Sequence, residues 1–513
     1  MSIVQTGAAP ARGNRHRWGQ DVMATPKTPG IQAIAATPAR VALHAMQQPG
    51  APAVVHRGIR IGYAILATHV LRAMEDLAAW GLRPAQVLGM EVADSYLHLV
   101  VLLAAEALGA TTLSCEADDL TASDVTTLCD RLIATHALAG GADALLITPD
   151  RAMRILAPTP DLSGLDSLAI PPDPSSTPRL MRTSGTTGQP KVLAMTRGLL
   201  HRHIEKNASL LPARAATKPD FLCAYRFSVR AAYTRAMMAL QRGGTIRFPD
   251  QGTLQALFAG ETGNHTVLTS GDLERLVQAI PAGTPRSDIA VEVVGGAVSD
   301  RLRQDTLDRL TPHLHITYAA NETHHISLIG AGHVGTLFPD ARVRIVDAAG
   351  LPLPLGEIGL IHARTDTMVD GYVGAPALTA ASFVDGWYRG GDVGYQPSAD
   401  TLVVIGRADD MLNIGGIKIA PGPIEDQLKA LDGIKDAVVT TTDDDLETGG
   451  ILVAIETNAG ADVARMRRLA APIVQRHARR FHLVVVDVLP RTDTHKIRRA
   501  AVRALCRRFV RDK

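Results

Sequence analysis

Residues 183–191 read TSGTTGQPK, and the interpretation of the whole fold starts from this stretch. It is not a Walker phosphate loop, because Val192 follows the lysine where that motif requires Ser or Thr. It still has what a phosphate group needs, since Gly185 and Gly188 let backbone N–H groups turn inward and Lys191 adds a positive charge. Taken alone, the stretch is equally compatible with a flexible polar loop and with a phosphate cradle.

Length and composition describe an ordinary globular protein. The 513 residues suffice for two or more domains, since a single core stops growing at roughly 250–300 residues. Hydrophobic residues make up 46% and charged residues 20%. The formal net charge of +2 favours neither nucleic acid nor a membrane surface as a partner.

Cysteine spacing and apolar runs favour a reducing, cytoplasmic location. Four cysteines lack CxxC spacing, so neither a disulfide framework nor a zinc site is expected. The apolar run that begins at Leu97 is interrupted by Glu106 and is shorter than the ~20 residues of a membrane span, so it predicts a buried helix. Residues 1–38 are expected to form a disordered tail; a transit sequence, or a true start at Met23, are the alternatives.

The pattern along the chain predicts an α/β fold with three parts. Strands and helices alternate from Ala51, which indicates doubly wound sheets covered by helices in a large N-terminal domain. From Ala341 the pattern changes to antiparallel hairpins, which predicts a small β-barrel-like subdomain. A charged turn near Asp409 separates an N-terminal domain, 39–408, from a smaller α+β C-terminal domain, 409–513.

Five further segments give the opening stretch its context. Together with TSGTTGQPK, and in the same order, they resemble the motifs of the acyl-adenylate-forming superfamily, which includes acyl-CoA synthetases, luciferases and the adenylation domains of peptide synthetases. The resemblance covers roughly residues 51–508 and implies a C-terminal domain that moves. The segments are GGA at 295–297, YAANE at 318–322, GWYRGGD at 386–392, GRADDMLNIGGIKIAPGPIE from Gly406, and PRTDTHKIRR at 490–499.

The resemblance implies a reaction in which a carboxylate attacks the α-phosphate of ATP and pyrophosphate leaves. Two anions must meet, so counter-charge is the central catalytic need. Lys496 would bridge the carboxylate and the α-phosphate, and Glu322 would hold Mg²⁺. The β- and γ-phosphates would be held by Thr183, Ser184, Gly185, Thr186, Thr187, Gly188 and Lys191.

The same resemblance implies sites for the nucleoside and for a thiol. Tyr318 would lie against adenine, beside the backbone of Gly295, Gly296 and Ala297. Asp392 and Arg407 would bind the ribose. The further implied residues are Asn321 at the nucleotide, Asp409 as the hinge, and Gly415, Gly416 and Lys418 beside a pantetheine tunnel.

Several positions depart from the family pattern. Ala319 and Asn321 replace Gly and Thr, and Gly390 replaces the Thr of a TGD triplet. His495 replaces the Gly before the catalytic lysine, which costs energy if that position needs positive φ and would lower adenylation efficiency.

Two observations concern the acid substrate. Arg230 falls near the position where amino-acid-activating relatives keep an Asp, so α-amino acids are disfavoured and a second acidic group is a candidate partner. The alternative is an ordinary surface arginine. His324 and His325 are adjacent and should point apart on a strand, so no paired metal ligands are expected, although one of them could line the substrate pocket.

The leading hypothesis is an AMP-forming acyl-CoA ligase that uses ATP, Mg²⁺ and CoA to convert a small carboxylate first to acyl-AMP and then to a thioester. The second is a stand-alone adenylation enzyme that loads a separate pantetheinylated carrier protein. The third is a nucleotide-binding module that has lost turnover, for which His495 is the best support. Fold alone does not separate the three.

Overall fold

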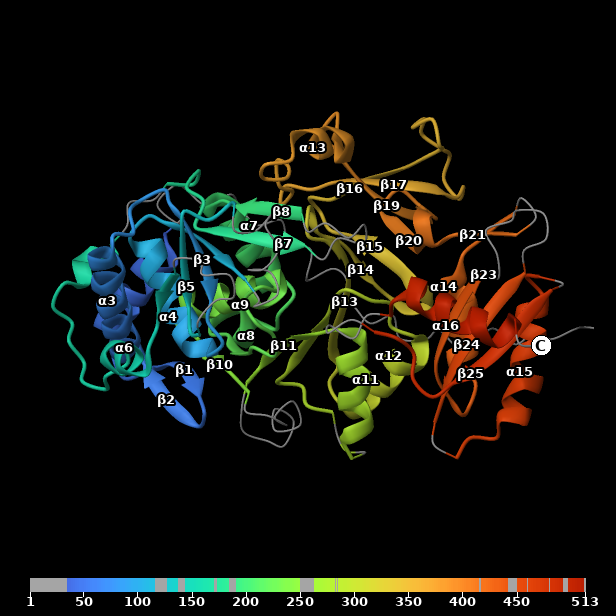
Figure 1. Ribbon diagram of the computed structural model, residues 1–513, viewed down its shortest axis with the longest axis horizontal. Coiled ribbons are helices and arrows are strands. Elements are labelled where there is room, and N and C mark those ends of the chain that lie inside the picture. The colour runs from blue at the N-terminus through green and yellow to red at the C-terminus, as the bar shows by residue number, and fades with distance from the viewer. Residues whose placement is uncertain are drawn as a thin grey trace, which may run out of the picture.

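The computed structural model describes thirteen stretches of the chain (Figure 1). They are residues 35–115, 127–136, 144–169, 173–183, 191–249, 263–281, 283, 285–414, 417–441, 450–458, 460–478, 480–491 and 497–511. The expected tail at residues 1–38 falls almost wholly outside them, and the first described helix is α2 (Thr37–Gln47).

A six-stranded sheet forms one layer of the N-terminal region. Its strands are parallel except for the last one, which pairs antiparallel with its neighbour. Their order is β6 (Ala144–Leu146), β5 (Arg131–Ala134), β3 (Val87–Glu91), β4 (Thr111–Ser114), β7 (Arg179–Thr183) and β8 (Lys191–Met195).

A larger sheet runs through the middle of the molecule and has fourteen strands among the described residues. Its first part is parallel apart from one hairpin strand. This part consists of β2 (Ile59–Gly62), β1 (Pro52–His56), β10 (Thr245–Arg247), β9 (Asp220–Leu222), β11 (His265–Leu268), β12 (Ala290–Val293) and β13 (His313–Ala320).

The second part of this sheet is antiparallel and includes the hairpins expected after Ala341. These strands continue the large sheet beyond β13 and reach the top of Figure 1. They are β14 (His324–Ile329), β15 (Val334–Leu337), β20 (Thr401–Arg407), β19 (Trp387–Tyr395), β17 (Gly359–Arg364) and β16 (Arg342–Val346), with β18 (Phe383–Val384) beside β19.

Helices cover the sheets, as the alternating pattern predicts. The apolar run from Leu97 is helix α4 (Ser95–Ala107), which is buried from Tyr96 to Glu106 and capped by the Asp94 carboxylate at the N–H groups of Tyr96 and Leu97. The others are α3 (Tyr63–Trp80), α6 (Pro149–Ile155), α7 (Arg197–Ala208), α8 (Ala213–Thr217), α9 (Arg230–Gln241), α11 (Ser270–Ala279), α12 (Asp300–Arg309) and α13 (Pro376–Ser382).

The C-terminal part has its own sheet and its own core, on the right of Figure 1. Alternate residues of its central strand face opposite ways: Val453 packs with α14 and α15, whereas Leu452 packs with α16. The elements are β21 (Leu412–Ile414), β22 (Ile417–Ile419), α14 (Pro421–Lys429), β23 (Ile434–Thr441), β24 (Ile451–Thr457), α15 (Val463–Gln475), β25 (Phe481–Val486) and α16 (Arg499–Arg511).

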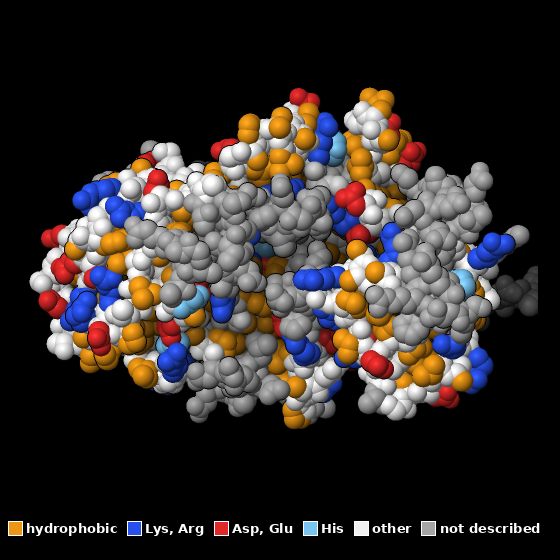
Figure 2. Space-filling view, viewed as in Figure 1, with side chains coloured by type: hydrophobic (Ala, Val, Ile, Leu, Met, Phe, Trp, Pro, Cys, Tyr) orange, Lys and Arg blue, Asp and Glu red, His pale blue; other side chains and the backbone are white. Residues whose placement is uncertain are grey.

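The surface carries charges of both signs. On the face seen in Figure 2, the described basic and acidic side chains are interspersed, which agrees with the net charge of +2. Within the described residues, every helix is too short or too polar to cross a membrane.

Candidate nucleotide and acyl site

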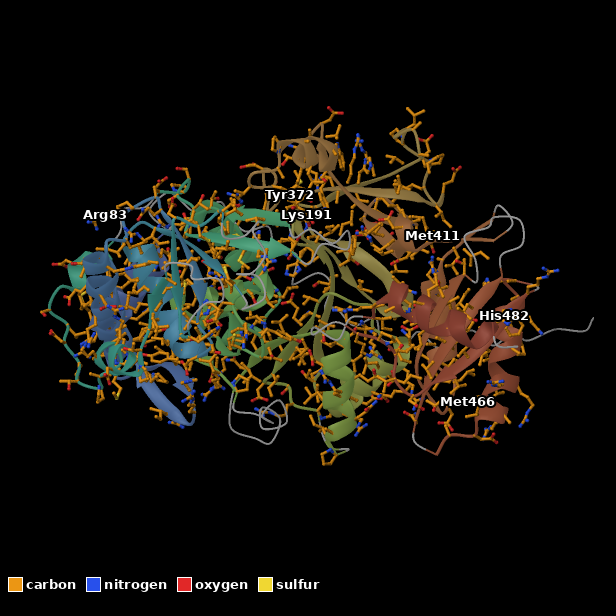
Figure 3. The ribbon with its side chains drawn as sticks, viewed as in Figure 1. Arg83, Lys191, Tyr372, Met411, Met466 and His482 are labelled. Carbon is orange, nitrogen blue, oxygen red and sulfur yellow. The ribbon has the colours of Figure 1, made fainter. Side chains whose placement is uncertain are left out.

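The expected phosphate segment joins two strands of the six-stranded sheet. Thr183 ends β7, Lys191 begins β8, and the two residues are paired across the antiparallel ladder. Residues 184–190, and with them Ser184, Gly185, Thr186, Thr187 and Gly188, lie outside the described residues. The Nζ atom of Lys191 lies 3.5 Å from the hydroxyl of Tyr372 and 5.0 Å from the centroid of its ring (Figure 3).

Glu322 is a buried carboxylate held by tyrosines. It follows β13, and its Oε1 accepts a hydrogen bond of 2.8 Å from the Tyr372 hydroxyl. The Tyr388 hydroxyl also lies close to Glu322. Burial, followed by the negative charge of Glu322, raises the pKa of both tyrosines, so each hydroxyl keeps its proton to donate.

The residues expected at adenine and ribose are neighbours in the structure. The Tyr318 hydroxyl donates to Oδ2 of Asp392 over 2.6 Å, and Nη1 of Arg407 donates to Oδ1 over 3.4 Å. Asp392 and Arg407 also face each other across β19 and β20. Tyr318 and Arg407, which come from distant motifs, therefore both contact the carboxylate of Asp392. One oxygen of this carboxylate, which was expected to accept from the ribose, accepts from Tyr318 here.

The glycine segment after β12 lies at the surface. Gly295 has a φ of +78°, and Gly295, Gly296 and Ala297 are exposed. A Cβ at position 296 would lie 2.6 Å from Oγ of Ser270. A side chain at position 296 would require the Ser270 hydroxyl to turn away, and the contact of Gly296 with adenine stays a prediction.

Two departures from the family pattern are bonded to one another. Arg230, the first residue of α9, donates from Nε to Oδ1 of Asn321 over 3.2 Å and from Nη2 to the carbonyl of Ala320 over 3.0 Å. Burial lowers the pKa of Arg230 to about 10, which leaves it charged at neutral pH. Asn321 thus offers an acceptor that Arg230 uses, and Arg230 is not the ordinary surface arginine of the alternative interpretation.

A third departure makes room for an aromatic ring. A Cβ at Gly390 would lie 2.9 Å from Cε1 of Tyr388, so a Thr at this position would displace the ring that reaches Glu322. Sequence reasoning missed both Tyr372 and Tyr388. The signal that could have found them is the aromatic residue in GWYRGGD and in DGYVG, each close to a recognised motif.

The expectation that His324 and His325 point apart is wrong. Their ring centroids are only 3.9 Å apart, because His324 has a φ of +64° and the β13–β14 register shifts next to it. The His203 ring of α7 stacks on His324, with centroids 4.1 Å apart and an interplanar angle of 11°. Burial lowers the pKa of all three rings, so they are neutral at neutral pH.

The remaining expected residues are only partly described. Asp409 lies in the turn Ala408–Asp410, is 80% exposed, and has its carboxylate 3.9 Å from Nη2 of Arg407. Lys418 belongs to β22, but its side chain is not described. Gly415, Gly416, His495 and Lys496 lie outside the described residues, so their roles stay predictions.

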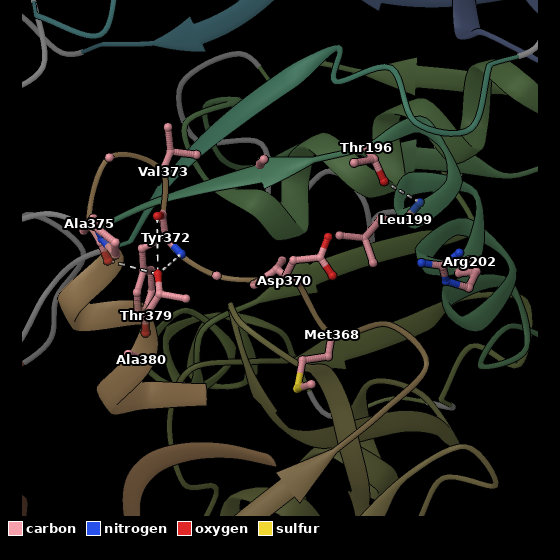
Figure 4. A pocket seen from close by; sticks show the side chains of 15 residues that line it. Thr196, Leu199, Arg202, Met368, Asp370, Tyr372, Val373, Ala375, Thr379 and Ala380 are labelled. Carbon is pink, nitrogen blue, oxygen red and sulfur yellow. Dashed lines mark hydrogen bonds between the residues drawn. The ribbon is translucent and has the colours of Figure 1, made fainter. Parts of the chain in front are cut away.

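An open groove lies beside Tyr372 (Figure 4). Its volume is about 590 Å³, and its walls come from β8, the start of α7, the segment 368–375 and α13. Arg202 and Asp370 supply charged side chains to its wall. Tyr372, which lines this groove, also contacts Glu322 and Lys191.

Comparison with known proteins identifies the family. A model of the AMP-binding enzyme family matches residues 41–373. Phenyloxazoline synthase MbtB from Mycobacterium tuberculosis is 27% identical over 92% of this chain, which spans 35% of the length of MbtB, about a third. Feruloyl-CoA synthase from Amycolatopsis is 29% identical over 91% of this chain and 97% of its own length.

Solved structures show the same fold. ATP-bound MatB from Rhodopseudomonas palustris superposes with a TM-score of 0.74 at 19% identity, over 93% of this chain and 99% of MatB. The fold, the ordered motifs and the matched model, which covers well over half of the sequence, agree. The chain belongs to the AMP-binding enzyme family.

Proposed function

We propose that this protein activates a carboxylic acid with ATP, forming an acyl adenylate and pyrophosphate, and then transfers the acyl group to CoA. The observation that carries the proposal is the pair of carboxylates, Glu322 and Asp392, each fixed by a tyrosine hydroxyl from a distant part of the chain. The similarity to feruloyl-CoA synthase over nearly its whole length supports the ligase reaction.

The nucleotide would lie between these carboxylates and the β7–β8 connection. Asp392 and Arg407 would hold the ribose, with Tyr318 and the backbone of 295–297 beside adenine. Lys191, Thr183 and the intervening residues would hold the β- and γ-phosphates. Fixed donors and charges of this kind need no reorganisation when negative charge develops, which is the main source of catalysis in such a site.

The donors present fit Mg²⁺. A carboxylate oxygen is a ligand of the kind that this ion prefers, and Mg²⁺ at nucleotides is commonly held by one or two carboxylates, water and phosphate oxygens. No group of three or more His, Cys, Asp or Glu side chains arranged to hold a metal ion occurs among the described residues, which is compatible with an ion bound mainly through the nucleotide. Bound there through Glu322, the ion would neutralise phosphate charge.

The C-terminal part would supply Lys496 and the thiol site. Its hydrophobic clusters contain only residues from Leu412 onward, which supports a boundary near Asp409 and movement about that residue. Lys496 would place its charge between the two reacting anions. In a second pose Gly415, Gly416 and Lys418 would border the thiol of CoA.

A carrier protein is the alternative acceptor. Both acceptors present a thiol at the end of a pantetheine arm, so the adenylation half-reaction does not distinguish them. Analysis of the thioester product distinguishes CoA from a carrier protein. The purified protein, ATP, Mg²⁺ and a panel of carboxylic acids should form acyl-AMP, detected by mass spectrometry, and added CoA should convert it to acyl-CoA. Acyl-AMP that reacts only with an added carrier protein would replace CoA by the carrier, and no acyl-AMP with any acid would favour the nucleotide-binding module.

A further inference from the structure

The hydroxyl of Tyr372 lies between the two charges that the proposed function needs most. Its proton is donated to Oε1 of Glu322 over 2.8 Å, and its oxygen lies 3.5 Å from Nζ of Lys191. The ammonium group also lies 5.0 Å from the centroid of the Tyr372 ring, within the range of a cation–π contact. Among the described residues, no ion pair joins Lys191 to Glu322, although both contact the same oxygen atom.

The position of Tyr372 is fixed from several directions. Its N–H donates to Oγ1 of Thr379 over 2.9 Å (Figure 4). The centroid of its ring lies 5.5 Å from that of the Phe383 ring. The side chains of Ser382 and Tyr388 also lie close to the Tyr372 hydroxyl. The hydroxyl is therefore held at one point rather than free to turn.

The segment around Tyr372 also forms backbone hydrogen bonds next to Lys191 and at Glu322. Val373 N–H donates to the carbonyl of Val192 over 2.8 Å, next to Lys191 in β8. Val369 N–H donates to the carbonyl of Glu322 over 2.9 Å. The strand that begins at Lys191 and the backbone of Glu322 are thus joined through residues 369–373, which puts the tyrosine at a set place between them.

A lysine and a glutamate this close would otherwise attract each other, because the charge of the buried Glu322 carboxylate is screened less than it would be in bulk water. A direct ion pair would occupy the carboxylate that is to meet the metal and the ammonium that is to meet phosphate. A neutral hydroxyl can donate to one and accept from the other, so it satisfies both without cancelling either charge.

We propose that Tyr372 is a positioning residue that keeps Glu322 and Lys191 apart and available for metal-bound ATP. This inference rests on the proposed function. Tyr388 places a second hydroxyl near the same carboxylate, and Gly390 leaves the space for its ring. The AMP-binding site would then be preset before the nucleotide arrives.

The test is Tyr372→Phe, which removes one oxygen atom and keeps the ring. ATP binding is measured by calorimetry over a range of Mg²⁺ concentrations, without carboxylic acid, so that no turnover contributes. We expect the Mg²⁺ concentration for half-maximal ATP binding to rise about tenfold, because a hydrogen bond to a charged group is lost. Tyr63→Phe is the matched control, since its buried hydroxyl donates to the carbonyl of Gly244, just before β10, and it should leave the Mg²⁺ dependence unchanged.

Repeating the measurement in a Lys191→Met protein distinguishes the separation of the two charges by Tyr372 from a role in which Tyr372 only supports Glu322. If the hydroxyl prevents an ion pair, Tyr372→Phe should change the Mg²⁺ requirement less than about twofold once Lys191→Met has removed the cation. A tenfold change in both backgrounds, or no change in either, would overturn the inference while leaving Mg²⁺-dependent ATP binding intact. If the unmodified protein showed no Mg²⁺-dependent ATP binding, the proposed function would be overturned, and this inference with it.

Discussion

Two regions meet at the segment from Tyr318 to His325, and they differ in how their polar atoms are satisfied. On the side proposed to bind the nucleotide, which we call the nucleotide side, Glu322 and Asp392 are each held by a tyrosine hydroxyl. On the other side lies the histidine cluster, which consists of His203, His324 and His325 with Arg230 beside them. In that described cluster, the buried nitrogen atoms without hydrogen-bond partners are Nδ1 of His203, Nη1 of Arg230, both ring nitrogens of His324 and Nδ1 of His325.

The protein itself supplies hydrogen-bond donors to Glu322 and Asp392, whereas it leaves several buried nitrogen atoms of the histidine cluster without partners. Buried polar atoms without partners cost free energy, and they gather here next to the residues expected to bind nucleotide. A donor such as Arg230 Nη1 would recover that cost by meeting an acceptor on the acyl group. The nucleotide side should therefore tolerate substitutions poorly in every assay, whereas substitutions in the histidine cluster should change which acid is used.

The largest effect is expected for Lys496→Ala. Removing the cation between two reacting anions should abolish carboxylate-dependent exchange of pyrophosphate into ATP, with a loss of at least about 100-fold. Thioester formation from supplied acyl-AMP should persist, because that step does not join two anions. Equal loss of both half-reactions would show that Lys496 supports the whole fold of the C-terminal part instead.

Glu322→Gln should have the next largest effect. It keeps the shape and an acceptor for Tyr372 but removes the negative charge, so exchange should fall about 100-fold and more Mg²⁺ should be needed. Glu357→Gln, at an exposed glutamate, is the control for the loss of one carboxylate. An unchanged Mg²⁺ requirement for Glu322→Gln would remove Glu322 from the metal site.

Arg230→Ala should alter selectivity rather than the reaction itself. If Nη1 pairs with a second acidic group, kcat/KM for dicarboxylates should fall about 10- to 100-fold relative to monocarboxylates. Asn321→Thr breaks the same Arg230 contact but keeps the cation, so it should leave this ratio unchanged. An unchanged ratio in Arg230→Ala would contradict the role in substrate choice.

The smallest effect is expected for the removal of a single buried histidine, measured as stability against pH. Burial lowers the pKa of His203, His324 and His325, so the folded state keeps them neutral while the unfolded chain protonates them below about pH 6.5. The unfolded state then binds more protons, and stability should fall as the pH drops below that value, by up to about 1.4 kcal/mol per pH unit for each ring. Thermal unfolding at pH 7.5 and 5.5 measures this, and a His324→Asn variant should show a smaller difference between the two pH values than the unmodified protein.

The sequence was sufficient for the features that depend on local pattern or on an ordered set of motifs. The buried helix that contains Leu97 and the antiparallel hairpins after Ala341 are confirmed. Motif order was enough to predict that Tyr318, Asp392 and Arg407 serve one ligand, and the structure places them together.

What the sequence did not reveal depends on backbone geometry and on contacts between distant segments. The left-handed backbone at His324 turns two adjacent rings to the same side, against the alternation expected of a strand. The bond between Arg230 and Asn321, and the space that Gly390 leaves for Tyr388, join departures that seemed unrelated along the chain. Tyr372 has no charge or motif role of its own, so only its contacts identify it.

The most direct test of the central claim is exchange of labelled pyrophosphate into ATP, measured with the unmodified protein over a panel of mono- and dicarboxylic acids. Formation of acyl-AMP at this site predicts exchange that requires both Mg²⁺ and an acid, and that is lost in Lys496→Ala. Absence of exchange with every acid, from protein that still binds ATP, would contradict carboxylate activation and leave a nucleotide-binding module.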